Sequence, residues 1–190
     1  MVGGGLILYT VIYMVVTKAA PPDGVCLRRD LLYAETWFWG REFWDYMFLY
    51  ARHAPGPVLA HFKTLLFFIP CEPCRVHFRA KLRKDPPPQG DAFSWLWRYK
   101  NEVNARIGKE LLPRGKAVAE QAALDEGSVL STFLRTLSKT LPRKEPPRIT
   151  KPGRRTYREA HVRAKCSLLM RQMRRVPRLA ALLATRRLRR

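Results

Sequence analysis

Acidic residues and cysteines are scarce in this sequence of 190 residues. There are 15 aspartates and glutamates against 36 lysines and arginines, and four cysteines. Four cysteines are too few for a small fold built on disulfides. No stretch alternates apolar and polar residues as a half-buried strand does, and no internal repeat is visible. The length excludes a large multidomain machine and favours one domain with extensions or two small domains.

Apolar residues, by contrast, are plentiful. They make up 47% of the chain, with aromatics at 11%, which is enough for a packed core despite the net charge. The charge is concentrated at one end, because residues 143–190 contain 17 basic and two acidic residues and so hold +15 of the total +21. We therefore expect a globular part of modest charge followed by a basic tail.

The N-terminal segment is apolar and uncharged from Val2 to Val16. Its length suits the core of a signal peptide better than a full membrane span, which needs roughly 20 residues. A span is reached if the segment extends to Ala20 with Lys18 at the membrane surface. We expect residues 1–22 to be a membrane anchor or signal-like segment. A cleaved signal and an apolar element of the soluble fold are the alternatives.

The spacing of apolar residues predicts four helices in the globular part, at about residues 31–54, 58–68, 71–85 and 91–107. Asp91 suits an N-cap and Gly108 a C-terminal stop. Shorter helices are predicted at 117–124 and 129–137, and an amphipathic one at 162–176 that ends before Pro177. The chain then divides into segment 1–22, a helical domain at 30–112, short helices at 113–142 and a basic, partly disordered tail at 143–190.

The strongest chemical signal is a CxxC motif, formed by Cys71 and Cys74 at the start of a predicted helix. Two cysteines at this spacing can close a disulfide, and a helix N-terminus stabilises the thiolate of the first one. Arg75 adds positive charge beside the pair. These features favour a redox-active disulfide on a helical scaffold.

Three other interpretations of the CxxC motif remain open. A zinc site would need two more ligands, and the nearby candidates His53, His61 and His77 do not form a second ligand pair; we expect no metal. A thioredoxin-like motif would need a preceding strand, which is not apparent. The two thiols could also be structural or incidental.

A second group of polar residues lies on the helix predicted at 91–107. Asn101 and Asn104 are one turn apart, and Lys109 follows the helix end. Two amides flanked by aromatic and basic residues suit a planar ligand that carries phosphates. The alternative is a solvated helix face with two ordinary asparagines.

Together these motifs resemble the FAD-linked Erv/ALR sulfhydryl oxidases. The family pattern is a Gly-Arg-x-x-Trp helix, a Pro-Cys-x-x-Cys helix and an Asn-x-Val-Asn helix followed by Gly-Lys. In this sequence the pattern corresponds to Gly40-Arg41-Glu42-Phe43-Trp44, Pro70-Cys71-Glu72-Pro73-Cys74, Asn101-Glu102-Val103-Asn104 and Gly108-Lys109. The match covers roughly residues 35–109, and its order and spacing both fit.

The resemblance implies an all-α fold in which a four-helix bundle holds FAD and a short fifth helix follows. It also implies that Cys74 lies next to the flavin and that Cys71 exchanges with the substrate. The implied reaction oxidises dithiol protein substrates and passes electrons through the cysteine pair to FAD and then to molecular oxygen, giving hydrogen peroxide. The implied cofactor-binding residues are Gly40, Arg41, Trp44, Phe48, Trp95, Lys100, Asn101, Val103, Asn104 and Lys109.

The sequence also departs from the family pattern. Phe48 and Lys100 each replace a histidine that is usual in the family, and Arg83 replaces a cysteine that in cellular members helps to tie down the fifth helix. A second CxxC, which often serves as an electron shuttle, is missing, and only Cys26 and Cys166 remain. This reduced form resembles the viral members. Burial of Cys166 at an interface is favoured over a shuttle role.

Partners and location are expectations from the same sources. Family members usually form homodimers through the first helices, and Trp37, Phe38 and Trp39 could supply an apolar surface. The basic tail could contact an anionic membrane or nucleic acid. The alternative function is a basic nucleic-acid- or membrane-binding structural protein with an incidental CxxC. A viral protein would lie at a membrane through its N-terminus, in the host cytoplasm or the virion; otherwise the mitochondrial intermembrane space or the secretory pathway is expected.

Overall fold

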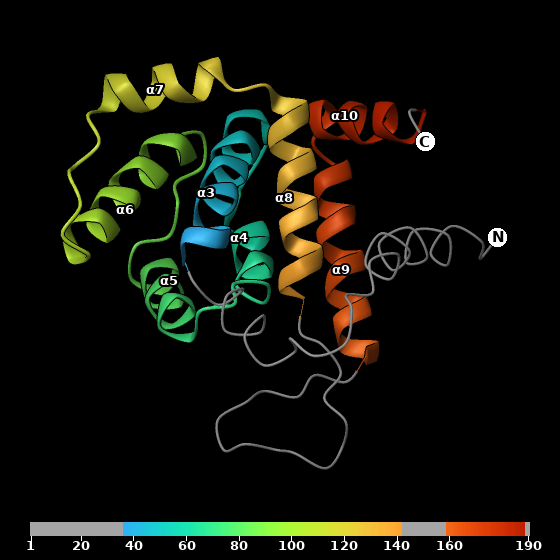
Figure 1. Ribbon diagram of the computed structural model, residues 1–190, viewed down its shortest axis with the longest axis horizontal. Helices are drawn as coiled ribbons and strands as arrows, with labels where there is room; N and C mark the ends of the chain where they lie inside the picture. The colour runs from blue at the N-terminus through green and yellow to red at the C-terminus, as the bar shows by residue number, and fades with distance from the viewer. Residues whose placement is uncertain (1–35, 142–158, 189–190) are drawn as a thin grey trace, which may run out of the picture.

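A computed structural model describes residues 36–141 and 159–188, and these residues contain helices and no strands (Figure 1). This confirms the predicted all-α class. The N-terminal segment 1–22 and Cys26 lie outside the described residues. The helices are α3 (Thr36–His53), α4 (Leu59–Leu65), α5 (Glu72–Lys84), α6 (Ala92–Arg106), α7 (Arg114–Ala123), α8 (Glu126–Thr140), α9 (Glu159–Arg174) and α10 (Pro177–Leu188).

Helix α3 is at the centre of the fold, where it packs against α6, α7, α8 and α10 (Figure 1). It can contact elements on several sides because its large apolar residues are not confined to one stripe, and every residue from Tyr46 to Tyr50 is buried. The ring of Tyr46 stacks on Phe133 of α8, with centroids 3.7 Å apart. The same helix thus supports α6 on one side and α8 on the other.

The predicted helix boundaries at α5 and α6 are confirmed. The Asp91 carboxylate accepts a hydrogen bond from the Ser94 amide at 3.3 Å and so caps α6. Gly108 follows α6 with a φ of 68°, a left-handed conformation that favours glycine. Helix α5 begins directly after Cys71 and carries Pro73 in its first turn, where proline is well tolerated.

The C-terminal region was expected to be a basic, partly disordered tail with a helix at 162–176. Within it, residues 159–188 form two helices packed on the rest of the fold. Helix α9 packs against α4, and α10 packs against α3. Helix α10 also contacts α8, beside which it lies in Figure 1. Pro177 ends α9, as predicted, but it is also the first residue of α10, where its missing amide hydrogen costs nothing. The apolar stripe predicted for α9 joins the core through buried Cys166, Leu169, Met170, Met173 and Val176.

None of the helices in the described ranges is long and apolar enough to cross a membrane.

Candidate functional site

Cys71 and Cys74 form a disulfide at the start of α5, with an S–S distance of 2.14 Å and Cα atoms 5.2 Å apart. Cys71 is the N-cap residue, and its Sγ accepts a hydrogen bond from the Cys74 amide at 3.2 Å. Both cysteines are half-buried and pack against the core. The pair is therefore partly accessible, and the first sulfur lies where the helix N-terminus favours negative charge.

Arg75 fixes the loop that leads into the disulfide. Its guanidinium donates hydrogen bonds to the carbonyls of Ile69, at 2.5 Å, and Pro70, at 3.1 Å. It also pairs with Glu72, and its side chain is only 13% exposed. Sequence reasoning assigned Arg75 a purely electrostatic role, whereas the structure shows that it binds the backbone on the N-terminal side of the cysteines.

The side of α5 that faces the core contacts aromatic residues of α6. Phe78, one turn after Cys74, is buried and stacks on Tyr99 with ring centroids 5.2 Å apart. Tyr99 in turn lies 5.6 Å from the ring of Trp44 on α3. Burial raises the pKa of Tyr99 to about 12, so its hydroxyl stays protonated at neutral pH. A continuous aromatic cluster thus links the disulfide helix to the Gly-Arg-x-x-Trp helix.

Lys100 lies against this aromatic cluster. Its Nζ is 6.0 Å from the ring centroid of Trp44 and 5.6 Å from that of Phe48, distances typical of cation–π contacts. Burial lowers the pKa of the Lys100 ammonium. Within the described ranges Lys100 forms no ion pair with a carboxylate. A partly desolvated cation on two ring faces is a donor set that fits a planar, anionic ligand such as a flavin nucleotide.

The two asparagines predicted to bind a cofactor are hydrogen-bonded to the loop after α6. The Asn101 amide donates to the Leu112 carbonyl at 2.9 Å, and its oxygen accepts from the Leu112 amide at 2.8 Å. Asn104 donates to the Glu110 carbonyl at 3.1 Å, and the Trp97 indole adds a bond to the Leu112 carbonyl at 2.7 Å. Sequence reasoning missed this anchoring because the partners are backbone atoms, which no motif identifies. Contacts of the asparagines with a cofactor stay predictions.

The other predicted cofactor residues are dispersed. Trp95 is fully buried, and its indole donates to the Asp85 carbonyl at 2.9 Å. Arg41 pairs with Asp45 at 3.5 Å and lines a hollow of about 270 Å³ between α3 and α8, which does not include the cysteines. Their roles toward a cofactor stay predictions, as do those of Gly40 at the start of α3, half-buried Val103 and exposed Lys109.

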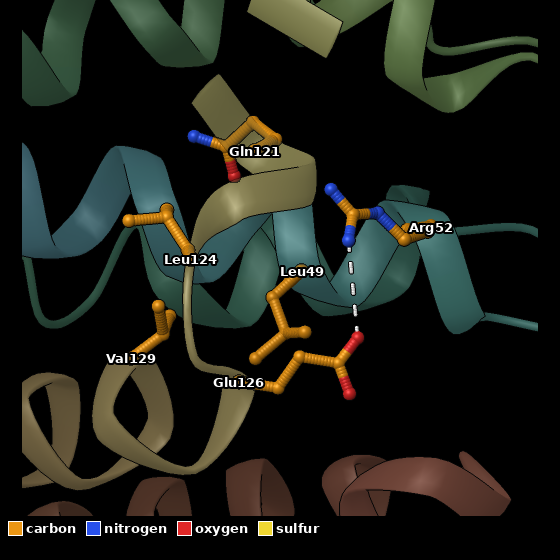
Figure 2. A pocket seen from close by; sticks show the side chains of 6 residues that line it. All are labelled: Leu49, Arg52, Gln121, Leu124, Glu126 and Val129. Atoms are coloured by element: carbon orange, nitrogen blue, oxygen red, sulfur yellow. Dashed lines mark ion pairs between the residues drawn. The ribbon is translucent and has the colours of Figure 1, made fainter. Parts of the chain in front are cut away.

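A smaller hollow near the C-terminal end of α3 belongs to the scaffold (Figure 2). Figure 2 shows the guanidinium of Arg52 directed at the carboxylate of Glu126, 3.8 Å away. Glu126 also accepts from His53 at 2.6 Å and from Arg178 of α10 at 2.5 Å. With a volume of about 10 Å³, the hollow has room for about one water. The cluster joins α3, α8 and α10 and does not form a ligand site.

Neither a shuttle nor a metal site is formed by the described residues. Cys166 is buried in α9, and burial raises the pKa of its thiol to about 11, which makes it a poor nucleophile. No group of three metal-ligating side chains occurs within residues 36–141 and 159–188. His61, for example, is not available as a metal ligand, because its two ring nitrogens are hydrogen-bonded to Tyr46 and Gln172.

The fold and site define a class of protein: within the described residues, an all-α scaffold carries a half-buried disulfide at the N-terminus of α5. An aromatic cluster that includes Phe78, Tyr99 and Trp44 joins this helix to the rings that Lys100 contacts. Residues 41–123 match the Erv1/Alr family. A protein of Invertebrate iridescent virus 6, named "Putative FAD-linked sulfhydryl oxidase 347L", is 30% identical over 97 residues, covering 42% of this chain and 87% of the relative. The chain belongs to the Erv1/Alr family. No solved structure matches it significantly.

Proposed function

We propose that this protein is a flavin-dependent thiol oxidase of the viral type that makes disulfides in protein substrates. The observation that carries the proposal is the Cys71–Cys74 disulfide, half-buried at the start of α5. Membership of the Erv1/Alr family and the name of the viral relative support the same activity.

In the proposed exchange Cys71 meets the substrate, as the family resemblance implies. A substrate thiolate attacks Sγ of Cys71, the Cys71–Cys74 bond breaks, and Cys74 leaves as a thiolate. The second substrate thiolate then attacks the substrate sulfur of the mixed disulfide and releases Cys71. The substrate loses two electrons and two protons, which the cysteine pair gains. The helix N-terminus and the Cys74 amide, 3.2 Å from the Cys71 sulfur, stabilise negative charge on Cys71.

The residues present fit FAD as the cofactor, because aromatic faces and an unpaired cation lie together. Half-buried Trp44 would pack on the ring system, whereas Phe48, which is 1% exposed, packs against Trp44. Lys100 would supply positive charge to an anionic part of the cofactor. FAD, when bound, would supply an acceptor for the two electrons of the Cys71 and Cys74 thiols. In this proposal oxygen is the final acceptor and is reduced to hydrogen peroxide.

Absorbance and oxygen uptake test the proposal. The purified full-length protein is expected to show flavin absorbance and to consume oxygen with dithiothreitol, producing one peroxide per disulfide formed. Cys71→Ser and Cys74→Ser should each abolish oxygen uptake, whereas Cys166→Ser, which changes a buried thiol, should retain it. A folded, colourless protein that cannot be reconstituted with FAD would contradict the proposal.

A second candidate function rests on the charge of the C-terminal helices. Between Ala160 and Thr185 there is no acidic residue, and the exposed side chains include Arg163, Arg171, Arg174, Arg175 and Arg178. Such a surface attracts an anionic membrane or nucleic acid without sequence specificity. Changing the exposed Arg171, Arg174 and Arg175 to glutamate leaves the buried side chains of α9 and α10 in place and should abolish any such binding. Unchanged binding would exclude this surface.

The remaining partners and the location stay predictions. For the expected homodimer, the structure offers Phe38 and Trp39 near the start of α3, but Trp39 is buried within its own chain at 6% exposure. A dimer would therefore need a surface beyond Trp39, and sedimentation of the purified protein decides whether one forms. Membrane attachment through residues 1–22 is tested by fractionation with and without that segment.

A further inference from the structure

Helix α5 exposes one continuous face that begins at the disulfide. With about 3.6 residues per turn, the positions opposite buried Phe78 and Leu82 fall on a single side of the helix. We call this side the outer face of α5. It consists of the exposed residues Pro73, Val76, His77, Ala80, Arg83 and Lys84.

The end of the outer face nearest the disulfide is apolar. Val76 is 48% exposed and is one of four large apolar residues that are exposed in the described ranges. A single exposed valine is ordinary on a protein surface. This one, however, lies two residues after Cys74, and exposed Pro73 and Ala80 extend the apolar surface on either side. A partner that reaches the disulfide along α5 would bury this surface.

The far end of the outer face is cationic. Arg83 and Lys84 are both exposed and form no ion pair within the described ranges. Two other cations of α5 are neutralised locally, since Arg75 pairs with Glu72 and Lys81 pairs with Asp85 and Glu102. At a rise of about 1.5 Å per residue, the two open charges lie about 15 Å along the helix from Cys74.

We propose that the outer face of α5 is the docking surface for the dithiol substrate. Its partner is a cysteine-bearing segment that carries an apolar residue next to the thiols and acidic side chains about 15 Å further along. Continuity with the disulfide and the exposed cations Arg83 and Lys84 at the far end of the face support this assignment. The inference rests on the proposed thiol oxidase function and names the class of substrate for it.

Two matched peptides test the docking surface. Each carries a reduced cysteine pair and a leucine beside it, and one ends in four glutamates, the other in four lysines. With the full-length protein at low ionic strength, kcat/KM should favour the acidic peptide by about tenfold, which corresponds to two surface charge pairs. The preference should appear in KM, and salt should reduce it. Equal values for the two peptides would overturn the proposal.

Variants separate the outer face from general electrostatics. Arg83→Glu together with Lys84→Glu should reverse the preference, while oxidation of dithiothreitol stays unchanged. The matched control is Lys116→Glu with Arg135→Glu, which removes the same charge from exposed positions on α7 and α8 and should keep the preference. An equal effect of both double variants would refute docking on α5. Val76→Asp should lower kcat/KM for the acidic peptide and leave the rate of dithiothreitol oxidation unchanged.

A readout without flavin distinguishes failure of this inference from failure of the proposed function. In Cys74→Ser, the Cys71 thiolate attacks a peptide that carries a mixed disulfide with thionitrobenzoate, forms a disulfide to the peptide, and releases the coloured thiolate. Release should be about tenfold faster with the acidic peptide than with the basic one, and slower after Arg83→Glu with Lys84→Glu. Equal rates would refute docking even in an active oxidase. A preference in this variant, together with no dithiothreitol oxidation by the wild-type protein, would leave docking supported and the oxidase function refuted.

Discussion

The imidazole of His61 on α4 lies 3.1 Å from the amide oxygen of Gln172 on α9, through Nδ1. On its other side, Nε2 is 2.9 Å from the hydroxyl of Tyr46, and Tyr50 stacks on the ring with centroids 3.6 Å apart. His61 is 1% exposed. This part-buried hydrogen bond connects two residues that are 111 positions apart in the sequence, and it holds α9 against the oxidase core.

Stability should depend on pH through His61. Burial lowers its pKa from 6.5 to about 3, so between these values the unfolded chain binds a proton that the folded one does not. The contribution of neutral His61 to the unfolding free energy is complete above pH 6.5. It is lost as the pH falls, by up to about 1.4 kcal/mol per pH unit. Urea unfolding at pH 7 and pH 5 measures how much unfolding free energy the protein loses on acidification. This decrease should be smaller in His61→Gln than in the wild type, and it should equal the wild-type decrease in the control His77→Gln, which changes an exposed residue. An identical pH dependence of the wild type and His61→Gln would contradict the assignment.

Replacing Arg75 should affect both stability and the redox potential of the disulfide. Arg75→Gln removes charged hydrogen bonds to the Ile69 and Pro70 carbonyls and should lower the unfolding free energy by about 1.5–3 kcal/mol. Loss of the cation should also make the Cys71–Cys74 potential more negative, because the thiolate is less stabilised. Equilibration with glutathione buffers measures the potential. Arg75→Lys should have a redox potential close to that of the wild type but a lower unfolding free energy. Arg79→Gln should change neither quantity.

Asn101 should prove important for the loop that follows α6. Asn101→Ala leaves the amide and carbonyl of Leu112 without this partner. It should lower the unfolding free energy by about 1–3 kcal/mol. Proteolytic cleavage within residues 108–113 should accelerate accordingly. Asn104→Ala, which removes a single bond at an exposed site, should have a smaller effect. If both variants are cleaved at the wild-type rate, the amides do not anchor this loop.

Cys166 should be nearly inert in the folded protein. With Cys26, Cys71 and Cys74 changed to serine, it is the one remaining thiol. A pKa raised from 9 to about 11 lowers the thiolate fraction at pH 8 by about a hundredfold, and burial lowers access further. Alkylation with iodoacetamide should therefore be slow until urea unfolds the chain. Rapid alkylation of the native protein would place Cys166 at the surface and reopen a shuttle role.

Much of the site was predictable because its signals are local. Cys71 and Cys74 are three residues apart, so a disulfide between them needs only a helix start, which Pro73 favours. The Asp91 cap and the Gly108 stop likewise depend on a few neighbouring residues. The cation on Trp44 and Phe48 was less predictable, since Lys100 is brought to those rings by the packing of α6 against α3.

The basic C-terminal region shows where local reasoning stops. Its arginines indicated a tail. The apolar stripe of α9 predicted the helix, but it did not predict which surface of the fold covers the stripe. Only the tertiary structure shows that α9 packs on α4 and that α10 reaches Glu126. Glu126 carries a lowered pKa, because hydrogen bonds from Arg178 and His53 outweigh its burial.

The sequence by itself determined the helical class, the family pattern and the reactive cysteine pair, because spacing, caps and breakers act over one or two turns. The tertiary structure decided how the remaining polar groups are used: His61 as a neutral buried link, Asn101 as a loop anchor, Cys166 as an inert core thiol, and the outer face of α5 as open surface. These outcomes depend on contacts between helices distant in the chain, where burial and the available partner set the state of each group.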